Sequence, residues 1–193
     1  MKFKRTQSGI SVISMLLVTA AVSVALFKTI SYFNDAQYSY ESHENALDLI
    51  ELARKISSAT EIDGDCSKVD KSFVVNNNLI PKSWRVDKSN PIDPIIYWGK
   101  DDLSKAVINT DLDSRFIPPG GLIDGYDLFS IKLRNYKTDD VPGVITNLVN
   151  NFDYVVYSGY FIKDMNGFHA DVLNEALKNA ANRSGLLVAK MGC

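Results

Sequence analysis

Few residues in this chain are suited to chemistry. His43 and His169 are the only histidines among 193 residues, and no Ser or Cys nucleophile motif, no metal-binding His cluster and no Gly-rich phosphate loop accompanies them. We expect His43 to lie at a packing face or subunit contact of a long helix. His169 is expected in a turn, or capping the helix that follows it. The sequence therefore predicts no enzyme, no catalytic residue and no cofactor.

Two short acidic segments carry the oxygen ligands that Ca²⁺ uses. They are Asp63-Gly64-Asp65 and Asp111-Leu112-Asp113. Neither matches the twelve-residue loop that makes a calcium site specific, so both are typical of solvated turns. We expect no metal site.

The two cysteines, Cys66 and Cys193, are far apart in the sequence. In an exported protein, two cysteines most simply form one disulfide, which here would tie the C-terminal residue to a loop. The alternatives are lipidation of a cysteine or a metal site, but a metal site needs more ligands than these cysteines and two histidines provide. We expect a Cys66–Cys193 disulfide.

An apolar run occupies residues 10 to 27, with no charge, no Gly and no Pro. As a helix it would be about 27 Å long, close to the ~30 Å core of a bilayer. Lys2, Lys4 and Arg5 precede it, and this bias keeps the N-terminus in the cytoplasm and sends the rest of the chain across the membrane. Three kinds of processing fit: a signal peptide cut after Ala25, an uncleaved anchor, or removal of a basic leader after Gly9.

The helical pattern continues beyond this run. There is no Pro or Gly between Thr29 and Thr60, and the first breaker is Gly64. Apolar residues recur at the spacing of an amphipathic helix, at Ala46, Leu49 or Ile50, Ala53 and Ile56. We expect one helix of about fifty residues, apolar all round in its first half and on one face in its second.

The start of the chain resembles the type IV pilins and the related secretion pseudopilins. The resemblance rests on Lys4-Arg5-Thr6-Gln7-Ser8-Gly9 followed by Ile10-Ser11-Val12-Ile13-Ser14-Met15-Leu16-Leu17. It implies that a prepilin peptidase cuts after Gly9 and that the new N-terminal Ile10 is methylated. It also implies a long helix that serves first as membrane anchor and then as filament core.

The same resemblance implies where the protein works and what it meets. The precursor would lie in the inner membrane of a Gram-negative bacterium, beside an assembly platform, and the mature form in an extracellular pilus among other pilin subunits.

One position departs from the family pattern. Most members carry Glu at the fifth mature residue, and here that residue is Ser14. In the family this carboxylate meets the amino terminus of the subunit assembled before it, inside an apolar core where an unpaired charge is costly. A subunit at the filament tip has no predecessor, so Ser14 favours a tip or initiating minor pilin. The alternative is a tolerated substitution in an ordinary subunit.

Three later segments resemble the type IVb branch of that family. They are a short helix ending in Leu79-Ile80-Pro81 before Trp84, a strand at residues 95 to 99, and a strand at 129 to 135 leading to a helix that starts near Pro142. In that branch the Pro-initiated helix usually carries a disulfide cysteine. None stands in residues 141 to 151 here, so the Cys66–Cys193 pairing is not taken from the family.

The rest of the chain predicts short elements separated by loops. We expect loops at 61–72, 85–94 and 111–126, strands at 95–99, 105–110, 128–134 and 186–191, and helices at 141–150 and 170–181. The aromatic run Tyr154 to Ile162 predicts a strand in the core, or otherwise an exposed binding surface. The fold class is α+β: a type IV pilin roll, one long helix packed on an antiparallel sheet of about 4–5 strands.

These expectations divide the chain into a leader at 1–9, a membrane or filament-core helix at 10–35 and a globular domain at 36–193. The formal charge of −2 becomes −5 once a leader with three basic residues and no acidic one is removed, which argues against nucleic acid as a partner. We expect a minor pilin of a type IVb-like pilus. A major pilin or pseudopilin is the first alternative, and a periplasmic or anchored binding domain is the second.

Overall fold

The computed structural model of the chain describes residues 12–61, 65–90, 92–99, 102–109, 128–181 and 183–191. Within these ranges, the side chains of residues 12–15, 18, 31, 33–39, 41, 42 and 183 are not described. The chain divides into two compact units, Met1–Tyr40 and Glu41–Cys193. The predicted loop at 111–126 lies outside the described residues.

A single helix, α1 (Val12–Thr60), runs through both units. In the second unit it buries Ala46, Leu49, Ala53 and Ile56, the residues whose spacing predicted an amphipathic helix, together with Leu52. The helix ends at Thr60, whose hydroxyl donates back to the Ile56 carbonyl at 2.8 Å. The predicted helix and its buried face are therefore confirmed for this part of α1.

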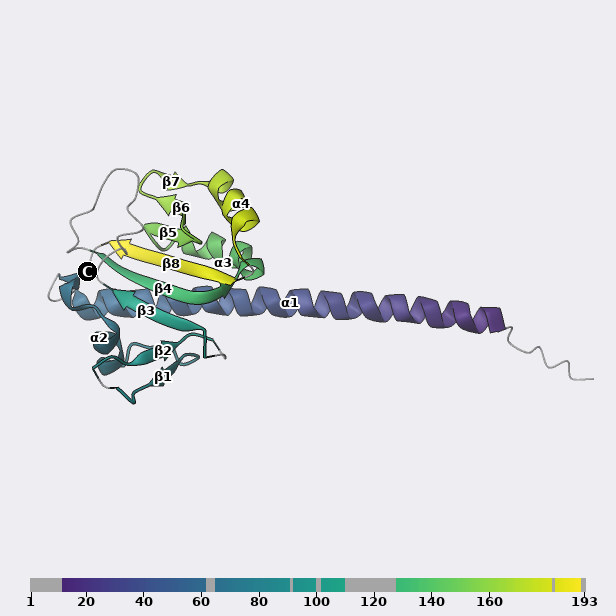
Figure 1. The fold of residues 1–193 in the computed structure, drawn as a ribbon, viewed down its shortest axis with the longest axis horizontal. Helices are drawn as coiled ribbons and strands as arrows, with labels where there is room; N and C mark the ends of the chain where they lie inside the picture. Colours follow the sequence, from purple (N-terminus) through teal and green to yellow (C-terminus); the bar gives the residue numbers. More distant parts are fainter. Residues whose placement is uncertain are drawn as a thin grey trace, which may run out of the picture. The chain divides into compact units, whose positions relative to one another are not determined.

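The second unit contains an eight-stranded sheet in which every pairing is antiparallel, in the order β1-β2-β3-β4-β8-β5-β6-β7 (Figure 1). Its strands are β1 (Arg85–Asp87), β2 (Ile95–Tyr97), β3 (Lys105–Asn109), β4 (Leu128–Lys137), β5 (Tyr154–Tyr157), β6 (Tyr160–Asp164), β7 (Gly167–Phe168) and β8 (Arg183–Met191). The long strands β4 and β8 lie together at the centre.

Short helices connect the strands. They are α2 (Lys71–Asn76), α3 (Val141–Leu148) and α4 (Ala170–Asn179), with 3-10 turns at Cys66–Lys68 and Thr138–Asp140. Pro142 lies in the first turn of α3, where its missing N–H costs nothing. The architecture is therefore α+β with few helices, as expected.

The central strands are buried on both faces, and alternate residues point to different clusters. Phe129, Ile131 and Leu133 of β4 lie in one core with the buried face of α1, and α3 contributes Val144 and Leu148 to it. Leu128 lies in a second cluster with the alternate residues of its neighbours, namely Tyr154, Val156, Leu187 and Ala189. The sheet face that carries this second cluster is called the outer face below.

The aromatic run Tyr154 to Ile162 forms two strands and not one. Ser158 and Gly159 both have positive φ, 52° and 91°, which is the geometry of the tight turns that join antiparallel strands. Tyr154, Val155, Val156, Tyr157 and Ile162 are buried. The core interpretation of this run is confirmed.

Several sequence expectations were wrong. The sheet has eight strands and not four or five, because β1, β7 and the β5–β6 division were missed. The loop predicted at 85–94 contains β1, and the loop predicted at 61–72 contains a 3-10 turn and the start of α2. Asp65 and Asp70 cap these two turns: their carboxylates accept hydrogen bonds from the N–H groups of Ser67 at 2.7 Å and Phe73 at 2.6 Å.

Candidate functional site

The N-terminal part of α1 exposes large apolar side chains. Phe27 and Tyr32 are 75% and 76% exposed, and Leu16, Leu17, Val22, Val24, Leu26 and Ile30 are each at least half exposed. A contiguous apolar surface of this kind is unusual in a soluble monomer and marks a surface that contacts lipid or other proteins. We call residues 16 to 32 the apolar segment.

Two hydroxyl groups in the apolar segment donate hydrogen bonds within the helix. Ser23 donates to the carbonyl of Thr19 at 2.8 Å, and Thr29 donates to that of Ala25 at 2.9 Å. Their polar atoms therefore need no water, which suits an apolar environment. Ala20, Ala21 and Ala25 add small side chains that let another helix approach closely.

Among the residues that the structure describes, no helix combines the length and the apolar character needed to cross a membrane.

The predicted processing site lies outside the described residues. Gly9 and Ile10 precede Val12, the first described residue, so cleavage and methylation remain predictions, as does the span at 10–27. Ser14 lies in the first turns of α1, but its side chain is not among those described.

Cys66 follows α1 in the 3-10 turn Cys66–Lys68 and is fully buried in the main core. No described cysteine is a free thiol. Its predicted partner Cys193 lies outside the described residues, so the Cys66–Cys193 pairing remains a prediction.

The two histidines occupy different settings. His43 is exposed on α1, so its expected place at a packing face within the chain is wrong, while a subunit contact stays a prediction. His169 is the N-cap residue of α4, as expected.

His169 also contacts a buried carboxylate. Its Nε2 lies 3.1 Å from Oδ1 of Asp164, whose side chain is 7% exposed. Oδ1 also accepts a hydrogen bond from the Asn166 N–H at 2.7 Å. Burial raises the pKa of Asp164, but the hydrogen bonds from His169 and Asn166 and the attraction to His169 outweigh it, so the pKa is lowered overall. Sequence reasoning missed this pair because a β-turn brings its members together.

Of the two acidic segments, only Asp65 is described, and it lies in a turn. Asp65 accepts hydrogen bonds from the Ser67 N–H at 2.7 Å and the Ser67 hydroxyl at 2.6 Å. Asp63, Asp111 and Asp113 lie outside the described residues. Within the described ranges, no three His, Cys, Asp or Glu side chains cluster as a metal site would require.

Sequence reasoning also missed a charged row on the sheet. Arg85, Tyr97 and Lys105 stand directly opposite one another on β1, β2 and β3. The guanidinium carbon of Arg85 lies 4.9 Å from the centre of the Tyr97 ring, and Nζ of Lys105 lies 5.9 Å from it. The sequence gives no signal for this alignment, because β1 is too short to show a periodic pattern and the register between strands is set by the fold.

No protein-family model matches the chain, and no curated protein shows a significant similarity to it.

Proposed function

We propose that the protein is a minor pilin of a type IVb-like pilus, placed at the tip or initiating assembly. In this proposal the leader is cut after Gly9, Ile10 is methylated, and residues 10–35 anchor the precursor in the inner membrane. Assembly then transfers this segment into a bundle of pilin helices, and the Glu41–Cys193 unit faces outward.

The observation that carries the proposal is that the two parts of α1 differ in what their apolar side chains contact. One continuous helix has an exposed apolar segment at residues 16 to 32 and, from Ala46 to Ile56, a single buried face. The second part belongs to the core of a sheet domain, whereas the first part offers apolar surface to something else. Lipid and neighbouring helices are both apolar, so one surface can serve in both states.

Continuity of the helix also bears on the competing kinds of processing. Cleavage after Ala25 would cut α1 within its first third, between Ser23 and Thr29, whose hydroxyls both bond within the helix. A cleaved signal peptide has no reason to continue into the helix of the mature domain. This favours removal of a short leader over a secretory signal peptide.

The proposal is tested by the intact mass and N-terminal sequence of the protein from a host that carries a prepilin peptidase. We expect a chain that begins at Ile10 and carries one extra methyl group. After treatment with reductant its mass should rise by two hydrogens, because the Cys66–Cys193 disulfide opens.

Two variants sharpen this experiment. Gly9→Val should block cleavage, because the bulkier residue occupies the cut site, and Ser8→Ala should be processed like the unchanged chain. A start at residue 26, or a full-length chain beginning at Met1 in the presence of the peptidase, would contradict the proposal.

A further inference from the structure

The turn between β6 and β7 carries an Asn-Gly pair in open surroundings. Asn166 is exposed, and its neighbour Met165 is 63% exposed. Gly167 has φ 124°, and a Cβ placed on it would meet no other atom within 4 Å. The Asn166 side chain and the backbone of Gly167 therefore have room to move against each other.

An Asn that is followed by Gly can modify itself. The backbone nitrogen of the Gly attacks Cγ of the Asn, the new C–N bond closes a cyclic imide, and the side-chain nitrogen leaves as ammonia with the proton that the backbone nitrogen loses. Water then opens the ring at either carbonyl carbon, which gives aspartate or isoaspartate. Gly favours this reaction because no side chain obstructs the approach and its backbone adopts conformations closed to other residues.

Asn166 is the only Asn in the chain that precedes Gly. Other exposed asparagines precede larger residues, as Asn150 precedes Asn151 and Asn174 precedes Glu175. The Asn150 side chain also donates to the Thr146 carbonyl at 3.1 Å. The chain thus contains its own slower asparagines for comparison.

The Asp164 carboxylate holds the Asn166 amide only weakly. Oδ1 accepts the backbone N–H of Asn166 at 2.7 Å, whereas Oδ2 lies 3.5 Å from Nδ2 of the side chain. The second contact is at the long limit of a hydrogen bond, so little is lost when Cγ of Asn166 turns toward the Gly167 nitrogen.

The product would bring a new carboxylate beside Asp164. Burial, together with the carboxylates of Asp153 and Asp164, raises the pKa of Tyr154 on the outer face of the sheet, so two acidic groups already lie near this point. Conversion replaces the Nδ2 donor of Asn166 with an acceptor oxygen that repels Oδ2. Isoaspartate also lengthens the backbone of the turn by one carbon atom.

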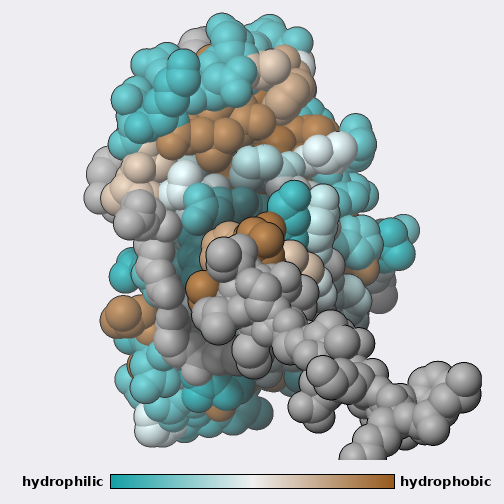
Figure 2. Space-filling model, turned by 90° about the vertical axis from the view of Figure 1, so that its right-hand side faces the viewer, coloured by the Kyte–Doolittle hydropathy of each residue, from teal (hydrophilic) through white to brown (hydrophobic). Residues whose placement is uncertain are grey.

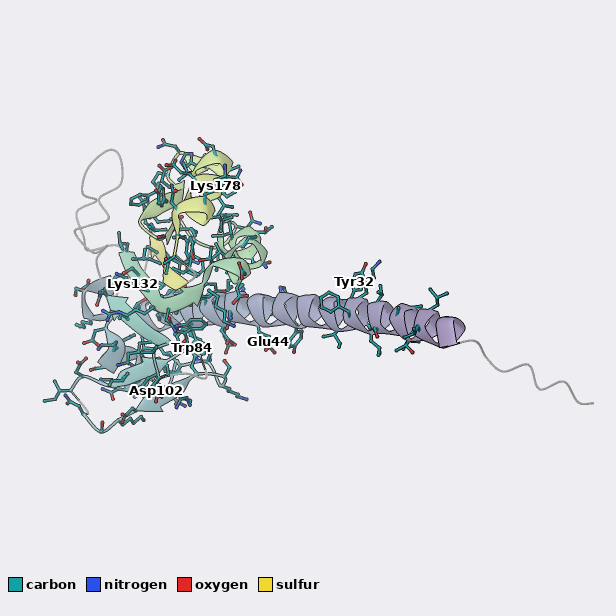
Figure 3. The ribbon with its side chains drawn as sticks, turned by 45° about the vertical axis from the view of Figure 1, so that its right-hand side comes forward. Tyr32, Glu44, Trp84, Asp102, Lys132 and Lys178 are labelled. Atoms are coloured by element: carbon teal, nitrogen blue, oxygen red, sulfur yellow. The ribbon has the colours of Figure 1, made fainter. Side chains whose placement is uncertain are left out.

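The turn is tied to the start of α4. The N–H of His169, the N-cap residue, donates to the Ile162 carbonyl at 2.9 Å, and the Leu173 N–H donates to the His169 carbonyl at 3.1 Å. His169 also contacts Asp164 through Nε2 at 3.1 Å. α4 packs against β6 (Figure 3, where Lys178 marks α4). A disturbance at Asp164 therefore reaches the first turn of this helix.

We propose that Asn166 is a self-modification site. It converts without an enzyme, through a cyclic imide with Gly167, into aspartate and isoaspartate, and the product loosens the contact between the β6–β7 turn and α4. Water is the only co-reactant. The inference does not depend on the proposed function, because it uses contacts within the Glu41–Cys193 unit alone.

The first test follows the full chain in a non-ionic detergent and a mildly alkaline buffer, with digestion and mass spectrometry at intervals. We expect the peptide with Asn166 to become heavier by the difference between an OH and an NH₂ group and to separate into two products. Conversion should be at least about tenfold faster at Asn166 than at Asn150. It should also accelerate as the pH rises, because the attacking nitrogen must lose its proton.

Asn166→Gln is the matched variant for this test. Its side chain would need to close a larger ring, so residue 166 should stay unmodified while Asn150 reacts as in the unchanged chain. Equal conversion at Asn166 and Asn150 would overturn the proposal. Conversion of Asn166 only after the chain is unfolded in urea would also overturn it, because the folded turn would then protect the residue.

The second test measures amide hydrogen exchange at His169 and Leu173 in the variant Asn166→Asp, which reproduces one product. We expect these two N–H groups to exchange about two- to tenfold faster, since like charges a few ångströms apart in water repel by that much. Asn174→Asp adds the same charge on α4, away from the turn, and should not accelerate exchange. Unchanged exchange in Asn166→Asp, or equal acceleration in both variants, would reject the effect on α4.

Discussion

Two charged side chains on β6 hold neighbouring elements in place. Nζ of Lys163 donates to the carbonyls of Val149 and Phe152, at 2.6 and 2.7 Å, and so caps the end of α3 with positive charge. The next residue, Asp164, accepts from Asn166 and His169 and ties the β6–β7 turn to the start of α4. The edge of the sheet is thus fixed to two helices by one pair of adjacent residues.

The effect of Asp164→Asn should depend on pH. The pKa of Asp164 is lowered in the folded chain, because the hydrogen bonds from His169 and Asn166 outweigh its burial. Ionised Asp164 therefore stabilises the fold fully above its unfolded pKa near 4, and this contribution is lost as the pH falls through the lower folded pKa. At pH 7 we expect Asp164→Asn to lower the free energy of unfolding by about 1 kcal/mol, since the charge-assisted hydrogen bonds from Asn166 and His169 become weaker, neutral ones.

Chemical denaturation of both chains between pH 7 and pH 3 measures this difference. The difference between the two stabilities should shrink once the pH falls below about 4 and continue to shrink through the lowered pKa of native Asp164. Asp139→Asn, an equal charge change at an exposed site, is the control and should stay within about 0.5 kcal/mol of the unchanged chain. A constant difference across the pH range would show that the charge of Asp164 contributes nothing.

Residue-level features were predicted only where they depend on near neighbours in the sequence. The N-cap position of His169 was predicted because a helical pattern begins at Ala170. Its contact with Asp164 depends on the turn at Asn166 and Gly167, where Gly167 has φ 124°. The alignment of Arg85, Tyr97 and Lys105 depends on the register between β1, β2 and β3, which composition does not encode.

Helices and strands whose apolar residues repeat regularly along the sequence were predicted. Strands that form only because they pair with a neighbouring strand were not. The buried positions of α1 repeat at helical spacing, and β4 alternates well enough to be recognised. β1 has only Val86 as an apolar residue and β7 is two residues long, so neither carries a periodic signal. Their strand character comes from pairing with β2 and β6.

Helix α4 was predicted correctly as a helix, but its end was predicted at the wrong residue. Its apolar side, with Val172, Leu173 and Leu177 half-buried and Ala176 buried, packs against the main core. Its polar side lies at the top of the surface in Figure 2, above a band of hydrophobic residues. The helix ends at Asn179 and not at the expected residue 181, because pairing of β8 with β4 already begins at Arg183.

The two faces of α1 in the sheet domain should respond differently to truncation. Leu49 is fully buried in the main core, whereas Leu47, two residues away on the same helix, is 50% exposed. We expect Leu49→Ala to lower the free energy of unfolding by about 2–5 kcal/mol, because it leaves a cavity. Leu47→Ala should change it by less than about 0.5 kcal/mol, since Ala also favours helix.

Urea denaturation of the full chain in detergent, followed by near-ultraviolet circular dichroism, measures both variants under the same conditions. Equal destabilisation by the two substitutions would contradict the orientation of α1 against the sheet. A small loss for Leu49→Ala alone would show that the core collapses around the missing side chain.

At the scale of the whole molecule, the chain combines a domain that buries its own apolar residues with a helical segment that leaves its apolar residues exposed. The Glu41–Cys193 unit buries its aromatic and aliphatic residues in two clusters, on the two faces of one sheet. The apolar segment at 16 to 32 has large side chains exposed at nearly every turn. In the proposed function, this exposed segment is the part that would contact lipid in the precursor and other pilin helices in the filament.

In the proposed assembly, the residue at position 14 determines whether the subunit can occupy the tip or the shaft of the filament. A Glu at this position in a tip subunit would have no amino terminus of a preceding subunit to meet, and an unpaired carboxylate in an apolar core costs several kcal/mol. We expect Ser14→Glu to be inserted and processed normally, because residue 14 lies near the membrane surface in the precursor, but to reduce the number of pili per cell by at least about tenfold. Ser14→Ala should leave the number unchanged.

Counting pili by electron microscopy in cells with matched levels of each processed variant separates the two roles of Ser14. If pilus numbers fall only with Ser14→Glu, the absence of a carboxylate is a requirement of priming, and the subunit belongs at the tip. If Ser14→Glu cells carry normal pili, the carboxylate has found a partner, which means that another subunit precedes this one. The protein would then be an ordinary shaft subunit, because only a subunit with a predecessor can neutralise that charge inside the filament.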